Sequence, residues 1–149
     1  VVSAIILVAV IGAFFIVGSP ATARLVQFDD QKVTDLGNIQ YQIVNYWQKK
    51  GTLPTKLTDL QDPISGFTVP ADPQTKDQYE YIIKDATKLS FELCATFNKP
   101  SVNQLNSKSR PVAVPSFGYA DNWAHEAGRV CFERTIDKQL YPPLTKPGV

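Results

Sequence analysis

An almost unbroken apolar run at the start of the chain constrains its fold more than any other feature. Residues 1–17 contain one polar side chain, Ser3, and no charged residue occurs before Arg24. As a helix, about 20 uncharged residues rise about 30 Å, enough to cross the hydrocarbon core of a bilayer. We therefore expect a transmembrane helix over residues 1–19, in contact with lipid or with other helices. The side chains expected to make those contacts are Ile5, Ile6, Leu7, Val10, Phe14 and Phe15.

A second reading of the same segment is a secretory signal peptide. Ala21-Thr22-Ala23 has the small residues of a cleavage site that follows an apolar stretch. We favour a retained anchor and keep cleavage after Ala23 as the alternative.

The charged residues indicate one globular domain and argue against a nucleic-acid partner. All 15 basic and 14 acidic residues lie between Arg24 and Val149, and the net charge is +1. A stretch of this length can bury one modest core. Neither a run of Lys or Arg nor an excess of positive charge is present, so binding to nucleic acid is not expected.

An amphipathic helix is predicted over about residues 24–50. Its strongest apolar stripe lies in the C-terminal half, and we expect this half to pack on a sheet. The packing residues of that stripe are Leu36, Ile39, Ile43, Tyr46 and Trp47. Residues 20–35 are expected to be an exposed, membrane-proximal stalk, because Lys32 interrupts the stripe there. Gly51 is a natural helix terminator.

Strand-like alternation of apolar and polar residues follows over about residues 78–83, 89–97 and 129–136. Cys94 and Cys131, the two cysteines, lie in the last two of these segments. A disulfide between them would place residues 36–140 outside the cytoplasm, whereas two buried free thiols are the alternative. Residues 141–149, rich in proline and glycine, are expected to be a loose tail.

The order of these elements is similar to that of the type IV pilin and type II secretion pseudopilin superfamily. The resemblance covers about residues 1–97. It rests on the motifs Asp35-Leu36-Gly37-Asn38-Ile39-Gln40, Gly51-Thr52-Leu53-Pro54, Val69-Pro70-Ala71-Asp72-Pro73 and Tyr79-Glu80-Tyr81, with Tyr46, Leu57 and Leu60 between them. It implies an α+β fold, in which an N-terminal transmembrane helix continues into an amphipathic helix packed on a small antiparallel β-sheet.

Two family features are missing from this chain. Assembling pilins carry a Glu early in the apolar run, where it neutralises a neighbour's N-terminal amine, but no acidic residue here precedes Asp29. The Phe at the processed N-terminus is also missing. Either the chain begins after those positions, or this is a pilin-like domain that does not polymerise.

No set of residues predicts catalysis. His125 is the single histidine, so pairing with Cys131 as a nucleophile would lack an orienting third group, and a zinc site would lack ligands. Asp121, Asn122 and Glu126 could hold calcium, although solvated loop residues are the more ordinary interpretation. We expect Phe117, Tyr119 and Trp123 to form either a platform for a glycan or a partner subunit, or a cover for the open end of the core, which is the more ordinary interpretation. Glu80, Glu92 and Glu133 fall on polar strand faces with no cleft implied.

The sequence therefore predicts a structural protein, not an enzyme, with no cofactor, metal or small-molecule substrate. We expect a membrane-anchored pilin-like subunit of an extracellular filament or secretion-type assembly, whose partners are copies of itself or other pilin-like subunits. The alternative is a binding or sensory ectodomain of a bacterial membrane protein that does not polymerise.

Overall fold

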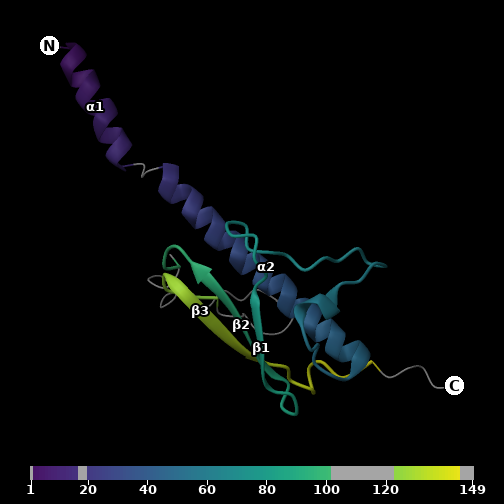
Figure 1. The fold of residues 1–149 in the computed structure, drawn as a ribbon. Coiled ribbons are helices and arrows are strands. Elements are labelled where there is room, and N and C mark those ends of the chain that lie inside the picture. The colour runs from purple at the N-terminus through teal and green to yellow at the C-terminus, as the bar shows by residue number, and fades with distance from the viewer. Residues whose placement is uncertain (1, 17–19, 102–122, 145–149) are drawn as a thin grey trace.

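A computed structural model describes residues 2–16, 20–101 and 123–144 of this chain. These residues form an α+β structure, as predicted, with two α-helices, a short 3₁₀ helix and a three-stranded antiparallel sheet. Figure 1 shows helix α2 lying along the sheet, while helix α1 extends away from it.

Helix α1 runs from Val2 to Ile16 and helix α2 from Pro20 to Lys50. Proline suits the first turn of a helix, because the amide it lacks would have no partner there and its φ angle is already helical. Helix α2 ends where Gly51 takes a φ of +73° and its amide donates to the Trp47 carbonyl at 2.7 Å. This left-handed glycine cap matches the terminator expected at Gly51.

The transmembrane helix expected over residues 1–19 is not found among the described residues. Neither α1 nor α2 combines the length and the apolar character that a bilayer span requires. Helix α1 contains 15 residues, which rise about 22 Å, against about 30 Å for the hydrocarbon core.

The sheet has the order β1-β2-β3, with β1 at Glu80–Asp85, β2 at Ser90–Phe97 and β3 at Gly128–Thr135. Both pairings are antiparallel, and β2 is the central strand. Alternate side chains of each strand therefore point either toward α2 or away from it.

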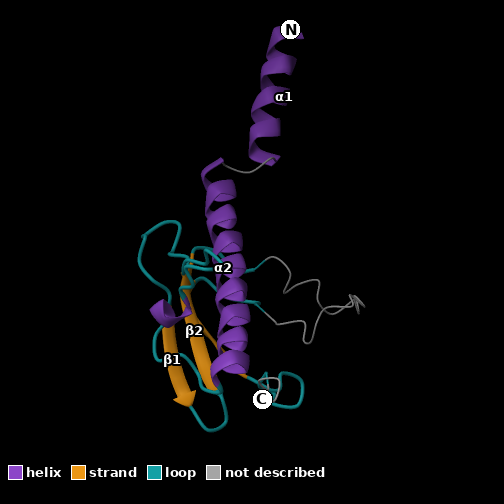
Figure 2. Ribbon diagram, turned by 90° about the vertical axis from the view of Figure 1, so that its right-hand side faces the viewer, coloured by secondary structure: helices purple, strands orange, loops and turns teal. Residues whose placement is uncertain are grey.

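The core lies between α2 and the sheet. Leu36, Ile39 and Ile43 of α2 are fully buried, and Phe91 and Leu93 of β2 are buried with them. Trp47 belongs to the same core, and Tyr46 packs against it partly buried. The 3₁₀ helix Leu57–Leu60 adds its two leucines. Figure 2 shows α2 and the strands as two adjacent layers.

Candidate functional site

Helix α1 presents a bare apolar surface. Its described side chains are almost all exposed; Val2 is 72% and Val8 70% exposed. In both ribbon views α1 stands apart from the sheet domain. Among the predicted assembly residues, Ile5, Ile6, Leu7 and Val10 are exposed, and the side chains of Phe14 and Phe15 lie outside the described part. A helix that is apolar all round is normally covered by other protein or by lipid.

A row of buried charges lies on α2, one turn after another. Asp29, Lys32 and Asp35 are 4%, 2% and 6% exposed. Spacings of three residues return to the same side of a helix, so the row continues the stripe that begins at Leu36. The exposed stalk expected over residues 20–35 is therefore wrong from Asp29 onward. The physical reason is that the sheet domain supplies polar partners to this part of α2.

Asp29 binds the chain just beyond the end of β2. Its carboxylate accepts hydrogen bonds from the Asn98 amide at 2.9 and 3.0 Å, the Asn98 side-chain Nδ2 at 2.8 Å and the Lys99 amide at 2.8 Å. Two backbone amides and one side-chain amide together satisfy the hydrogen-bonding capacity of this buried carboxylate. Asp29 thus attaches α2 to the end of the central strand.

Lys32 is held by three oxygen atoms from two segments. Its Nζ donates to Gln74 Oε1 and to the Thr96 carbonyl, both at 2.6 Å, and lies 3.3 Å from Asp72 Oδ2. The other Asp72 oxygen accepts the amides of Gln74 and Thr75, which fixes the loop that carries it. The ammonium group therefore joins α2, the loop and β2 at one point.

Asp35 completes the row. It accepts a hydrogen bond from the Tyr79 hydroxyl at 2.8 Å and one from Gln31 Nε2 at 2.8 Å. Burial raises the pKa of the Tyr79 phenol well above its ordinary value, and the Asp35 carboxylate raises it further. Tyr79 consequently remains a neutral hydrogen-bond donor.

The chain segment after Leu140 contacts the other end of α2. Trp47 Nε1 donates to the Tyr141 carbonyl at 2.9 Å, and the Leu144 amide donates to the Gln48 carbonyl at 2.8 Å. Residues 141–144 are thus attached, contrary to the loose tail expected, because the last carbonyls of a helix lack partners within it. Residues 145–149 lie outside the described part.

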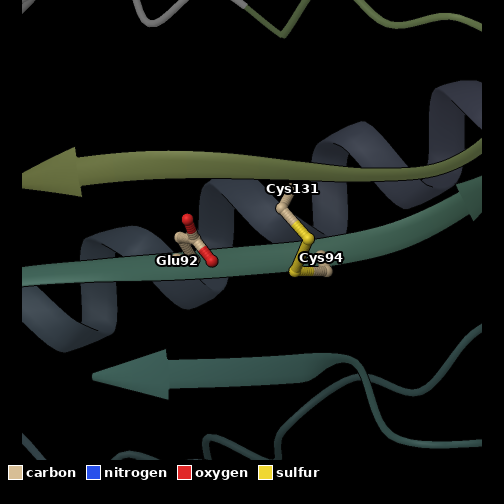
Figure 3. A group of neighbouring side chains, drawn as sticks. All are labelled: Glu92, Cys94 and Cys131. Atoms are coloured by element: carbon tan, nitrogen blue, oxygen red, sulfur yellow. A yellow bond between two sulfur atoms is a disulfide. The ribbon is translucent and has the colours of Figure 1, made fainter. Parts of the chain in front are cut away.

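The disulfide predicted between Cys94 and Cys131 is confirmed. The two cysteines are direct register partners on β2 and β3. Figure 3 shows their sulfur atoms on the face of the sheet that points away from α2, with Glu92 beside them. We call this the outer face.

An ion pair crosses the outer face from β3 to β1. Arg129 Nε and Nη2 donate to the two carboxylate oxygens of Glu80 at 2.9 and 2.6 Å, and Nη2 also lies 3.6 Å from Cys94 Sγ. The hydrogen bonds from Arg129 lower the pKa of the Glu80 carboxyl. Both side chains are about half exposed, so the pair contributes little to stability.

Among the described residues, Glu92, Cys94 and Cys131 form the group of neighbouring side chains that are of types able to bind a metal ion. Their ligand atoms lie within 4.8 Å of one another. The sulfur atoms are bonded to each other and not available as thiolates, the form in which cysteine binds metals. Glu92 itself pairs with Lys84 at 3.1 Å. The oxidised protein therefore offers one carboxylate here, which does not make a metal site.

His125 lies within the core and not at a reactive position. It is 5% exposed, stacks on Phe97 with ring centroids 3.7 Å apart, and places Nδ1 2.9 Å from the Trp123 carbonyl. Trp123 packs partly buried against Phe132, as expected for a core cover. With Cys131 oxidised, the structure provides no thiol nucleophile for this histidine.

Several predicted loop residues lie outside the described part. Among the possible calcium ligands these are Asp121 and Asn122, whereas Glu126 is described and exposed. Among the aromatic residues they are Phe117 and Tyr119. Of the three strand glutamates, Glu80 and Glu92 are engaged in ion pairs, and Glu133 accepts a hydrogen bond from Ser90 Oγ at 3.3 Å.

Sequence reasoning missed the row Asp29, Lys32 and Asp35. The signal that could have revealed it is the spacing, because Lys32 lies four residues before Leu36 on the core stripe. A lysine on a core face requires an anionic partner, and Asp72 is an acidic residue of the motif Val69-Pro70-Ala71-Asp72-Pro73.

Comparisons with protein-family models, curated proteins and solved structures found no match for this chain.

Proposed function

We propose that this protein is a pilin-like structural subunit, in which α1 serves assembly and the sheet domain forms the outer surface. The observation that carries the proposal is the exposed apolar surface of α1. Fully burying one Val, Leu or Ile side chain contributes about 1.5–3 kcal/mol, and α1 displays at least seven of them. In an assembly the α1 helices of neighbouring copies would cover one another, and lipid would cover them before assembly.

The interactions along α2 support the same proposal. Asp29 and Lys32 connect α2 to β2, and Trp47 connects its other end to residue 141. A helix attached at two places along its length holds its sheet domain in one orientation relative to itself. Copies whose α2 helices align in an assembly would therefore present their sheet domains in the same way, as a filament requires.

Electron microscopy of the full chain tests this function. The protein is purified in mild detergent, the detergent is removed, and the sample is imaged with and without phospholipid vesicles. Filaments that form without vesicles support the proposal. Vesicle-bound monomers would instead favour the anchored binding or sensory ectodomain, and freely soluble monomers would contradict both functions.

A substitution in α1 makes the test specific. Leu7→Asp places a charge on the exposed surface and should abolish filaments without changing the thermal unfolding midpoint of the sheet domain. Ile64→Asp is the matched control, because Ile64 is 95% exposed but lies in a loop of the sheet domain. Filaments that persist in Leu7→Asp would mean that assembly does not depend on α1, and their loss in both variants would mean that the effect is not specific to α1.

A further inference from the structure

The two sulfur atoms of the Cys94–Cys131 disulfide are not equivalent. Cys94 lies on the central strand β2 and is 1% exposed, whereas Cys131 lies on β3, one of the two edge strands of the described sheet, and is only partly buried. A thiolate that approaches the outer face thus has better access to Cys131. Access is one of the factors that decide which sulfur of a disulfide is attacked.

The direction of attack reinforces this difference. In thiol–disulfide exchange the incoming sulfur approaches along the S–S axis, opposite the sulfur that leaves. Figure 3 shows this axis crossing from β2 to β3. Attack on Cys131 therefore comes over β3, where the described sheet gives Cys131 no charged register partner, only the bonded Cys94. Attack on Cys94 would come over β1, where Glu80 is its register partner and carries a negative charge.

Charges around the sulfur atoms favour Cys94 as the leaving group. Arg129 Nη2 lies 3.6 Å from Cys94 Sγ, where a guanidinium stabilises the negative charge of a thiolate. Glu92 opposes this effect from the same strand, but Lys84 pairs with it at 3.1 Å. Glu80 opposes it by sharing the guanidinium of Arg129.

The geometry points to a directional thiol–disulfide exchange site, at which a thiolate attacks Cys131 and Cys94 leaves beside Arg129. The attacking thiolate forms a new disulfide bond with Cys131 Sγ, and the Cys94–Cys131 bond breaks. Its electron pair remains on Cys94 Sγ as a thiolate. Oxidation of the reduced protein follows the same path in reverse, so that Cys94 is the sulfur that closes the bond.

The partner is a protein with a redox-active pair of cysteines, because such a partner completes the reaction. After its first thiolate has bonded to Cys131, its second thiolate attacks the first and releases Cys131 as a thiolate. The partner leaves with a disulfide, this chain holds two thiols, and two electrons have been transferred. This inference does not depend on the proposed structural function.

Reduction rates of the folded full chain by dithiothreitol test the role of Arg129. Arg129→Gln should reduce the rate about threefold, because exchange rates fall as the leaving thiolate becomes less stable. Arg129→Lys should restore most of it. Glu80→Gln should raise the rate by a similar factor, since it removes the anion that shares the guanidinium.

These two glutamine variants separate electrostatics from loosening of the fold. Both remove the same ion pair, so a purely structural effect would change both rates in the same direction. That outcome, or an unchanged rate in Arg129→Gln, would overturn the proposal. Lys88→Gln is the control, because this exposed lysine belongs to the turn between β1 and β2 and pairs with Asp85.

Trapping identifies the attacked sulfur directly. The oxidised chain is mixed briefly with glutathione, quenched with acid and alkylated, and the two cysteines are read on separate tryptic peptides by mass spectrometry. We expect glutathione on Cys131 and the alkyl group on Cys94. Equal labelling, or glutathione mainly on Cys94, would overturn the assignment.

Discussion

Two parts of α2 lie against the same sheet domain but are held to it by different interactions. We call residues 29–35 the polar, N-terminal half of this contact and residues 36–47 its apolar, C-terminal half. From Leu36 to Trp47 the contact is apolar and depends on packing. From Asp29 to Asp35 it consists of hydrogen bonds and one ion pair. Apolar contacts are non-directional, whereas hydrogen bonds require defined distances and angles. The C-terminal half therefore supplies most of the stability, and the N-terminal half fixes how α2 emerges from the domain.

The largest effect is expected in the apolar half. Trp47→Ala should lower the free energy of unfolding by about 3–5 kcal/mol, because it empties a core position. It also removes the donor to the Tyr141 carbonyl. Tyr41→Ala, at a position 65% exposed on the same helix, is the control and should change stability by less than about 0.5 kcal/mol. Urea unfolding followed by circular dichroism measures both; a loss under about 1 kcal/mol for Trp47→Ala would refute this packing.

The disulfide should act on both halves of α2, because β2 contacts both through Phe91 and Thr96. Its reduction frees a loop with a sequence separation of 37 residues, which in the chain-entropy model costs about 3–4 kcal/mol. Reducing agent should therefore lower the thermal midpoint. An unchanged midpoint, with two thiols titrating after denaturation, would show that the bond contributes no stability.

The polar half is tested by Lys32→Met, which keeps the length of the side chain but removes its charge. It leaves Asp72, the Thr96 carbonyl and Gln74 without their shared donor. Breaking a buried pair costs about 3–5 kcal/mol, and we expect about 3 because the Asp72 side chain is still 11% exposed. Lys49→Met, at the exposed end of α2, is the matched control. Equal unfolding free energies for the two variants would mean that the buried interactions of Lys32 do not stabilise the fold.

The contrast between these halves explains what could be predicted from the sequence. Periodicity identifies apolar stripes, so it indicated Leu36, Ile39 and Ile43 on α2 and the alternation around Cys94. It carries no information about polar partners far apart in the chain. Lys32 and Thr96 are 64 residues apart, and only the fold brings them together.

The same limit applies to the ends of the chain. The pattern of residues 141–149 indicated a loose tail, since proline and glycine are common in such segments. The structure attaches residues 141–144 because the last turn of α2 has carbonyls to satisfy. Unpaired carbonyls occur at the C-terminal end of every helix, but the tertiary fold decides which segment donates hydrogen bonds to them.

The smallest expected effect concerns the hydrogen bond between Tyr79 and Asp35. Tyr79→Phe leaves the buried Asp35 carboxylate without one of its donors, at a cost of about 1.5 kcal/mol near pH 7. Asn98→Ala removes a side-chain donor to Asp29 and should also lower the free energy of unfolding. Tyr79→Phe leaves the hydrogen bonds of Asp29 intact. Thermal unfolding at pH 7 measures the difference. A Tyr79→Phe protein as stable as the wild type would show that Asp35 does not need this donor.

The pH dependence of the same variant tests the polar half independently. Burial and the Asp35 carboxylate raise the pKa of Tyr79, and burial also raises that of Tyr81, so the folded protein keeps protons that the unfolded chain loses near pH 10. Stability from these groups is complete below pH 10 and falls as the pH rises above it. Tyr79→Phe removes one of the two groups, so its melting temperature should fall less steeply between about pH 9 and 11. Parallel curves for both proteins would mean that Tyr79 ionises in the folded state as freely as in the unfolded one.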